Sequence, residues 1–290
     1  MDILEPGDFP EYSLLDCGGG RRLDSFCGYV IDRPDPHADM KSALSPAEWK
    51  TRAHARFVET SSRSGRWEVF KSPPENWVIG FSSGNMDIRL RLDLGGFKNI
   101  GIFPEQALNW QFIYEQTMKR KAASPRILNL FAYTGAASLA ACAAGGDVFH
   151  VDSARSTLNR GRENMLLSGL DKIHWVLEDA LKFVERERKR KRSYQGVIMD
   201  PPAFGKGPKG ELWKFEHGFE QLVDAVNGIV DKKDHFLVIN TYSRAAEKDS
   251  IHNTLNNKLL AHSFDLGDLY IRSEEGSLLP VGIYARSAIN

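Results

Sequence analysis

The chain has 290 residues, of which 42% are hydrophobic and 26% are charged, an ordinary composition for a globular protein. Its 38 basic and 38 acidic residues give a net charge of zero, which excludes a nucleic-acid partner held mainly by a global basic field but not one held by a local patch. No stretch approaches the roughly 20 apolar residues of a membrane span, and the acidic N-terminus has no signal-peptide pattern. The three cysteines lack metal-ligand spacing, so we expect a reduced, cytoplasmic protein without a metal site or a membrane partner.

Residues 1–104 predict a mostly β accessory domain on the substrate side of the protein. Strand-like runs at 12–16, 29–32, 67–70, 77–81 and 86–94 are separated by Gly, Pro and Ser clusters. The segment 18–22 predicts an exposed hairpin tip, although its two arginines could instead contact a phosphate. We expect a second domain over residues 105–290, and it begins with a helix at 107–120.

The most informative stretch is a βαβ unit over residues 126–152. The apolar run 126–131 predicts a buried parallel strand, which breaks at a turn ending in Gly135, where the backbone can approach a ligand closely. The small residues of 136–144 favour a helix, and the apolar run 148–151 ends with Asp152. A carboxylate at the tip of the second strand can accept hydrogen bonds from both hydroxyls of a ribose.

The turn of this unit discriminates between nucleoside cofactors. A dinucleotide needs the Gly-x-Gly-x-x-Gly pattern, so that a helix N-terminus can meet the pyrophosphate. Here Gly135 is followed by Ala136 and Ala137, and nothing is built to cradle a diphosphate. S-adenosylmethionine has no phosphate and fits this turn better. If only the turn is considered, one alternative remains: an ordinary βαβ unit in an enzyme that binds a different ligand.

Strands and helices alternate over the rest of the chain. Strands are expected at 173–177, 195–199 and 235–240, helices from about 180 to 191, at 216–230 and at 247–261, and a closing antiparallel pair at 264–271 and 280–286. The alternation predicts a Rossmann-like, doubly wound α/β fold with a mostly parallel seven-stranded sheet and an antiparallel last strand. Asp152, Asp179 and Asp200 all fall at carboxyl ends of strands, where such folds bind ligands. Asp179 and Ala180 offer an acceptor and a backbone N–H for an adenine.

The sequence Asp-Pro-Pro-Ala-Phe at 200–204 is the expected chemical centre. Two prolines fix the backbone just past a strand, so a carboxylate and carbonyl groups can hold an amine or a base edge in line with a methyl donor. Phe204 can stack on a flat substrate, although a tight turn with a buried Phe is the alternative. The stretch 205–211, rich in Gly and Lys, is a candidate lid.

Two basic stretches suggest a local surface for RNA. For the run 185–192 we favour a solvated helix end, because cations are stabilising near a helix C-terminus. The candidate RNA-binding surface comprises Arg186, Arg188, Lys189, Arg190, Lys206 and Lys209.

The ordered motifs resemble those of class I S-adenosylmethionine-dependent methyltransferases, in particular the branch of bacterial 23S rRNA large-subunit cytosine-C5 methyltransferases. The motifs are Asn129-Leu-Phe-Ala-Tyr-Thr-Gly135, Val151-Asp152, Glu163-Asn164, Asp179-Ala180 and Asp200-Pro-Pro-Ala-Phe204, preceded by Gly101-Ile-Phe-Pro-Glu-Gln106. The resemblance and the residue chemistry together assign the cofactor to Gln106, Asn129, Phe131, Ala132, Tyr133, Thr134, Gly135, Asp152, Ser153, Asp179, Ala180 and Asp200. Positioning of the nucleophile falls to Asp200, Pro201, Pro202 and Phe204.

Two departures from that branch set the expected chemistry. The branch usually begins with a PUA-type RNA-binding domain, which we expect this chain to lack. It also carries a cysteine after the fifth strand, because methylation at cytosine C5 needs a thiolate nucleophile, whereas residues 240–244 contain none. We therefore predict direct methyl transfer to a heteroatom of an RNA base, in ribosomal RNA. The alternatives are cytosine-C5 methylation with Cys17 or Cys27 as nucleophile, methylation of a protein or small molecule, an NAD-dependent oxidoreductase, and a non-catalytic RNA-binding subunit.

Overall fold

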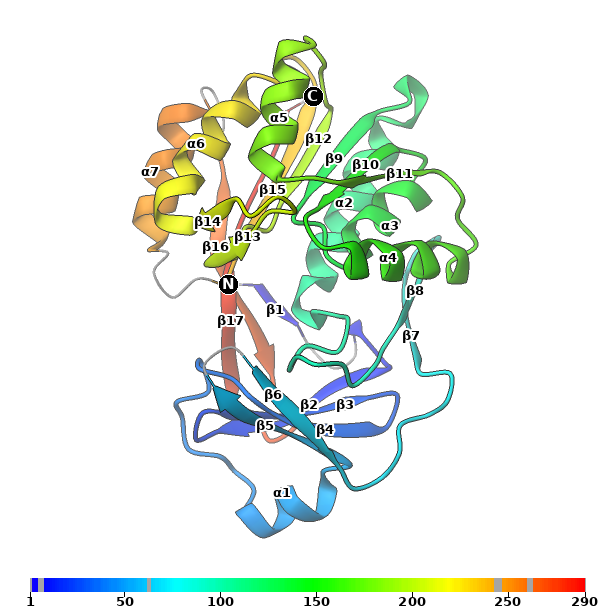
Figure 1. Ribbon diagram of the computed structural model, residues 1–290, viewed down its shortest axis with the longest axis vertical. Helices are drawn as coiled ribbons and strands as arrows, with labels where there is room; N and C mark the ends of the chain where they lie inside the picture. Colours follow the sequence, from blue (N-terminus) through cyan, green and yellow to red (C-terminus); the bar gives the residue numbers. More distant parts are fainter. Residues whose placement is uncertain (1, 5–7, 62–63, 243–246, 260–262, 290) are drawn as a thin grey trace. The chain divides into compact units, whose positions relative to one another are not determined.

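The computed structural model describes residues 2–4, 8–61, 64–242, 247–259 and 263–289 (Figure 1). The chain forms two compact units, each assembled from separate segments. Unit 1 comprises Met1–Ser82, Arg89–Leu108 and Leu269–Val281, and unit 2 comprises Ser83–Ile88, Asn109–Asp268 and Gly282–Asn290. The boundary expected between residues 104 and 105 stays a prediction. No helix within the described ranges combines the length and the apolar character that crossing a membrane requires.

Unit 2 is built on a mostly parallel sheet. Its parallel strands are β9 (Arg126–Leu130), β10 (Asp147–Asp152), β11 (Ile173–Leu177), β12 (Gly196–Met199) and β15 (His235–Thr241). The strand order is β11-β10-β9-β12-β15-β17-β16, in which β17 (Leu278–Ile289) runs antiparallel to β15 and β16 (Asp265–Arg272) lies next to β17. This confirms the predicted seven-stranded sheet with an antiparallel last strand. A short eighth strand, β1 (Asp2–Leu4), pairs with β16.

Helices cover both faces of this sheet (Figure 1). One face carries α2 (Ala107–Lys119), α3 (Ala136–Ala143) and α4 (Arg155–Leu167). The other carries α5 (Ala180–Lys189), α6 (Phe215–Asn227) and α7 (Lys248–Lys258). The structure confirms the predicted doubly wound arrangement, while α4 had not been predicted. The predicted end of the last helix, residue 261, lies outside the described residues.

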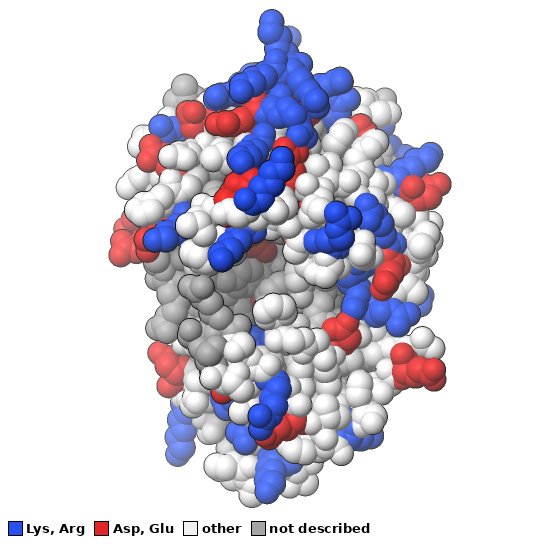
Figure 2. All heavy atoms as spheres, viewed as in Figure 1, with Lys and Arg blue, Asp and Glu red and all other residues white. Residues whose placement is uncertain are grey.

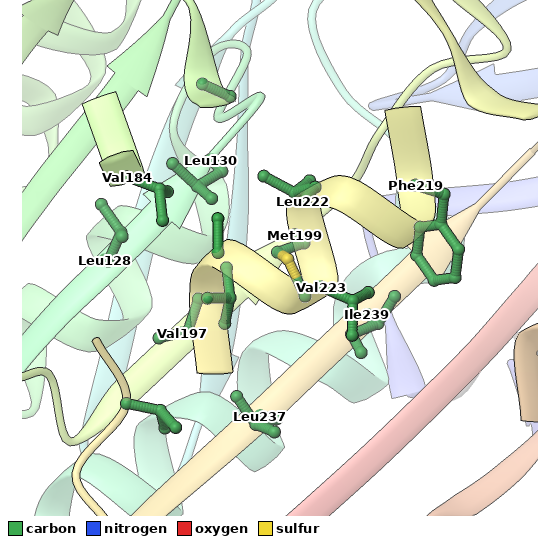
Figure 3. Close-up of a cluster of buried hydrophobic side chains, with 14 of the residues drawn as sticks. Leu128, Leu130, Val184, Val197, Met199, Phe219, Leu222, Val223, Leu237 and Ile239 are labelled. Atoms are coloured by element: carbon green, nitrogen blue, oxygen red, sulfur yellow. The ribbon is translucent and has the colours of Figure 1, made fainter. Parts of the chain in front are cut away.

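The core between the sheet and helices α5 and α6 is apolar (Figure 3). Strands that are buried on both faces have continuous apolar sequences, and these apolar runs allowed the strands to be predicted. Full burial of one such side chain contributes roughly 1.5–3 kcal/mol, so the packing holds the strand ends firmly in place. The side chains labelled in Figure 3 are Leu128, Leu130, Val184, Val197, Met199, Phe219, Leu222, Val223, Leu237 and Ile239.

Unit 1 contains a five-stranded sheet in sequence order. Its strands are β2 (Tyr12–Gly18), β3 (Arg21–Phe26), β4 (Tyr29–Pro34), β5 (Ala55–Ser61) and β6 (Ser64–Val69). All neighbours are antiparallel except β4 and β5, which are parallel and are connected through α1 (Pro46–Arg52). A separate two-stranded sheet pairs β7 (Val78–Ser83) with β8 (Met86–Arg91), of which Ser83–Ile88 belongs to unit 2. The mostly β N-terminal region is therefore confirmed.

Two features of unit 1 were missed or wrong. Helix α1 begins with a reciprocal capping box between Ser45 and Glu48, a signal that was present in the sequence. The exposed hairpin tip predicted at 18–22 is wrong for Arg22, which is only 4% exposed. Its guanidinium donates to buried Asp24 at 2.9 Å, and Arg33 Nε donates to the same carboxylate at 2.9 Å. Burial alone would raise the pKa of Asp24, but the two arginines outweigh it and lower that pKa.

A second buried acid in unit 1 lacks such compensation. Glu105 lies in the 3-10 helix η2 (Pro104–Gln106) and is 4% exposed. Its Oε2 atom has no hydrogen-bond partner among the described residues. Burial raises the pKa of Glu105, and the charges of Arg22 and Arg33 offset this only in part. A raised pKa means that the ionised form destabilises the fold at neutral pH.

We therefore predict that Glu105→Gln stabilises the protein at neutral pH, because the amide removes a buried charge without changing the shape of the side chain. The gain should disappear as the pH falls below 4.5, the ordinary value for a glutamate, where the wild-type side chain is protonated in both folded and unfolded states. Urea unfolding midpoints at both pH values measure this. Exposed Glu115→Gln is the control. A variant that is less stable than wild type at neutral pH contradicts the prediction.

Candidate functional site

The turn between β9 and α3 has a strained backbone. Phe131 and Tyr133 have φ angles of 56° and 51°, and Gly135, the N-cap of α3, has a φ of 97°. The left-handed conformation costs a residue with a side chain about 1–3 kcal/mol, so it persists only where neighbouring groups hold it. Because strained residues of this kind cluster at ligand sites, this turn and the contacts that hold it form part of the candidate site.

The side chain of Asp152, at the end of β10, holds it. Its Oδ2 atom accepts a hydrogen bond from the Tyr133 backbone N–H at 2.8 Å. Its Oδ1 atom accepts from the Ala154 backbone N–H at 2.8 Å and from Thr157 Oγ1 at 2.9 Å. Burial raises the pKa of Asp152, although these hydrogen bonds partly counteract the effect. Asp152 thus ties the turn after β9 to the start of α4.

A small pocket opens at the carboxyl ends of these strands. Three of its residues are acids: Asp152 ends β10, and Glu178 and Asp179 follow the neighbouring strand β11. The cavity measures only about 40 Å³. Its full lining is Phe131, Val151, Asp152, Ser153, Glu178, Asp179, Ala180, Pro202, Gly205, Lys206, Gly207 and Trp213.

The three acids give this pocket the chemistry of a nucleoside site without phosphates. Asp179 caps α5 by accepting a hydrogen bond from the Lys182 backbone N–H at 3.0 Å. Glu178, which the sequence had not singled out, accepts a hydrogen bond from Arg186 Nη1 at 2.6 Å. Carboxylates accept hydrogen bonds from hydroxyl and amino groups and attract a positive charge, whereas they repel phosphate. The lining therefore fits the ribose, adenine amine and sulfonium of S-adenosylmethionine.

A hairpin closes over the pocket, formed by β13 (Phe204–Lys206) and β14 (Leu212–Lys214). The Trp213 indole N–H donates to the Pro202 carbonyl oxygen at 2.7 Å, and its ring centre lies 5.0 Å from that of Phe131. Lys182 Nζ is 2.6 Å from Glu211 Oε1 at the base of the hairpin tip. Small-molecule pockets usually measure roughly 300–1,000 Å³, so this pocket is smaller than those that enclose such ligands. The lid predicted at 205–211 forms the tip of this hairpin, and its function stays a prediction.

The structure brings only some of the predicted site residues into the pocket. Asn129 is 2% exposed, and its amide donates to Ser138 Oγ at 2.9 Å in the core. Gln106 is a buried residue of unit 1. The predicted residues that line the pocket are Phe131, Asp152, Ser153, Asp179, Ala180 and Pro202. Those that do not are Gln106, Asn129, Ala132, Tyr133, Thr134, Gly135, Asp200, Pro201 and Phe204. Their roles stay predictions.

The six basic residues predicted to contact RNA are distributed along α5 and the hairpin β13–β14, and their role stays a prediction. Ala180, at the start of α5, lines the pocket, whereas Arg188, Lys189 and Arg190 lie at the other end of this ten-residue helix. At 1.5 Å per residue, the two ends are about 15 Å apart. Figure 2 shows Lys and Arg gathered over the far end of α5. Only Lys206 lies at the pocket itself.

Comparison with known proteins identifies the class to which this fold and pocket belong. Residues 59–217, more than half of the chain, match the family model of S-adenosylmethionine-dependent methyltransferases. A crystal structure of an S-adenosylmethionine-dependent methyltransferase from Agrobacterium tumefaciens superposes with a TM-score of 0.88 and 30% identity, covering 100% of this chain and 94% of that one. The chain therefore belongs to this family. The predicted cofactor is confirmed, and the dinucleotide alternative is set aside.

Two curated relatives resemble the chain over shorter stretches. The ribosomal RNA large subunit methyltransferase I of Erwinia tasmaniensis is 36% identical over 119 residues, which cover 40% of this chain and 27% of the relative. The ribosomal RNA large subunit methyltransferase K/L of Shewanella oneidensis is 25% identical over 239 residues, which cover 77% of this chain and 31% of the relative. The chain thus spans less than a third of the length of either protein.

We predict that Asp152→Ala weakens binding of S-adenosylhomocysteine by about ten- to a hundredfold, because hydrogen bonds to a charged group contribute roughly 1.5–3 kcal/mol and because the strained turn loses its support. In the wild type, affinity should begin to fall with decreasing pH before the ordinary aspartate value of 3.8 is reached, since the pKa of Asp152 is raised. Isothermal titration measures both effects. Asp147→Ala, at the opposite end of β10, is the matched control. Equal affinities for the two variants contradict the prediction.

Proposed function

We propose that this protein transfers a methyl group from S-adenosylmethionine directly to a heteroatom of a base in RNA, with ribosomal RNA as the substrate. The cofactor supplies a methyl group on a sulfonium, which is already a good leaving group. The protein's contribution is then positioning and exclusion of water. The names of the two curated relatives support ribosomal RNA as the substrate class.

The outward face of the hairpin β13–β14 carries this proposal. Phe204 faces Lys214 across the two strands, and Lys206 faces Leu212. Phe204 and Leu212 are 39% and 68% exposed, and both lysines are exposed as well. Gly205, Lys206 and Trp213 line the candidate pocket, whereas Phe204, Leu212 and Lys214 are not among its lining residues. Apolar surface for base stacking and cations for phosphates therefore meet beside the methyl-donor site.

The cysteines favour direct transfer over a covalent intermediate. Attack on cytosine C6 needs a thiolate. Burial and the neighbouring Asp16 raise the pKa of Cys17 to about 11, and burial and Glu11 raise the pKa of Cys27 to about 12. Burial also raises the pKa of Cys142, whose Sγ lies 3.5 Å from the Lys172 carbonyl oxygen. The pKa of each of the three thiols is thus shifted away from the thiolate that this attack needs.

The test is incubation of the protein with radiolabelled S-adenosylmethionine and a cell extract that contains ribosomes and free RNA. We expect label in material that ribonuclease destroys and protease does not. Label that appears in protein, or in molecules too small to be RNA, contradicts the proposed substrate.

We further predict that Phe204→Ala lowers kcat/KM for RNA by roughly tenfold to a hundredfold, because stacking of one base on an aromatic ring contributes about 1–3 kcal/mol. The affinity for S-adenosylhomocysteine should stay unchanged. Leu166→Ala, an exposed apolar residue of α4 at 70% exposure, is the matched control. A Phe204 variant with wild-type kcat/KM removes this face from the RNA-binding surface.

A further inference from the structure

Unit 1 contains a large cavity that the methyl-transfer site does not use. It measures about 630 Å³ and lies between one face of the five-stranded sheet and helix α1. Each strand of the sheet or its immediate end contributes to it, and α1 contributes Trp49 and Lys50. The size falls within the range of pockets that bind small molecules and nucleotides, roughly 300–1,000 Å³.

Charged side chains of alternating sign line the sheet face of this cavity. Asp32 of β4 pairs in register with Arg56 of β5, and Arg56 pairs in register with Glu68 of β6. Buried Asp32 accepts from Arg21 Nε at 2.5 Å and lies 2.9 Å from Arg56 Nε, so one carboxylate orients two guanidinium groups. With Lys50 and Glu68, which also line the cavity, the five charged residues keep one excess positive charge. Donors and acceptors thus alternate along one wall.

An aromatic ring stands at the rim of the same cavity. Phe70 follows β6 and is 57% exposed, which is unusual for so large an apolar side chain. Trp49 covers the opposite side, where its indole N–H is already used by Asp16 at 2.7 Å, so its apolar ring surface is what it offers the cavity. A flat ring beside an array of donors and acceptors matches a nucleobase, and guanidinium groups match a phosphodiester.

We infer that this cavity of unit 1 binds one nucleotide of a single-stranded RNA. Phe70 stacks on the base, Asp32 and Glu68 contact its polar edge, and Arg56 and Lys50 contact the phosphodiester. Arg21 belongs to the segment 18–22, for which a phosphate contact was one of two interpretations, and it lines this cavity. The inference deepens the proposed function, on which it rests, by naming a second RNA-binding site on the chain.

The test measures binding of a short, fluorescein-labelled single-stranded RNA of mixed sequence by anisotropy over a series of salt concentrations. Phe70→Ala should weaken binding roughly tenfold at every salt concentration, because stacking does not depend on ions. Arg56→Gln should weaken binding and also lower the slope of log K against log salt by about 0.7, the contribution of one phosphate contact to a single strand. Arg52→Gln, an exposed arginine of α1 outside the cavity, is the matched control.

Both substituted side chains are about half exposed, at 57% for Phe70 and 48% for the Arg56 side chain, so we expect folded variants, which circular dichroism melting verifies. Methyl transfer to RNA by the wild type together with unchanged RNA binding in both variants overturns the cavity inference and leaves the proposed function standing. RNA binding that depends on Phe70 and Arg56 without any methyl transfer to RNA overturns the proposed function alone. A wild type that neither binds nor methylates RNA overturns both.

Discussion

The hydrogen bonds accepted by the Asp152 carboxylate are the constraint on which the candidate site depends. They fix the turn after β9, whose Phe131 and Tyr133 backbones would relax if left unsupported, and the start of α4. The same carboxylate lines the pocket, so one side chain both builds the site and contributes to its surface. Its burial disfavours the charged form, and the hydrogen bonds that it accepts counteract this only in part. The turn after β9 and the start of α4 are therefore held in place without a ligand.

Elements that are determined by a local sequence pattern could be predicted from the sequence. Features that depend on contacts between side chains distant in sequence could not. Continuous apolar runs identified β9 and β10 because both faces of these strands are buried. The stretch 205–211 was interpreted as a loop because its composition is that of a loop. The hairpin that contains it depends on contacts of Trp213 with Pro202 and Phe131. Arg22 was expected at the surface because nothing local indicates that Arg33 and Asp24 join it inside the sheet.

A net charge of zero conceals a separation of charge within the chain. Carboxylates gather at the candidate pocket, where Asp152 ends β10 and both Glu178 and Asp179 follow β11. Cations gather on the outward hairpin face and at the far end of α5. An acidic pocket attracts a sulfonium, whereas a basic surface attracts a polyanion. The electrostatic potential would therefore direct the cofactor and the RNA of the proposed reaction to different parts of the protein. Composition averages over these regions and therefore could not reveal them.

The pairing of β1 with β16 has a consequence for the order of folding. Residues 2–4 join residues 269–271 in parallel register, and both segments belong to unit 1. During synthesis, the five strands β9 to β15 of the central sheet emerge before β16 does, so an early strand waits while most of unit 2 is made. Contacts between such distant segments form slowly because a long loop must close. Strand β1 is thus among the last strands to pair. Until β16 is available, the backbone N–H and C=O groups of β1 are unpaired, and an unpaired strand edge can aggregate with other chains.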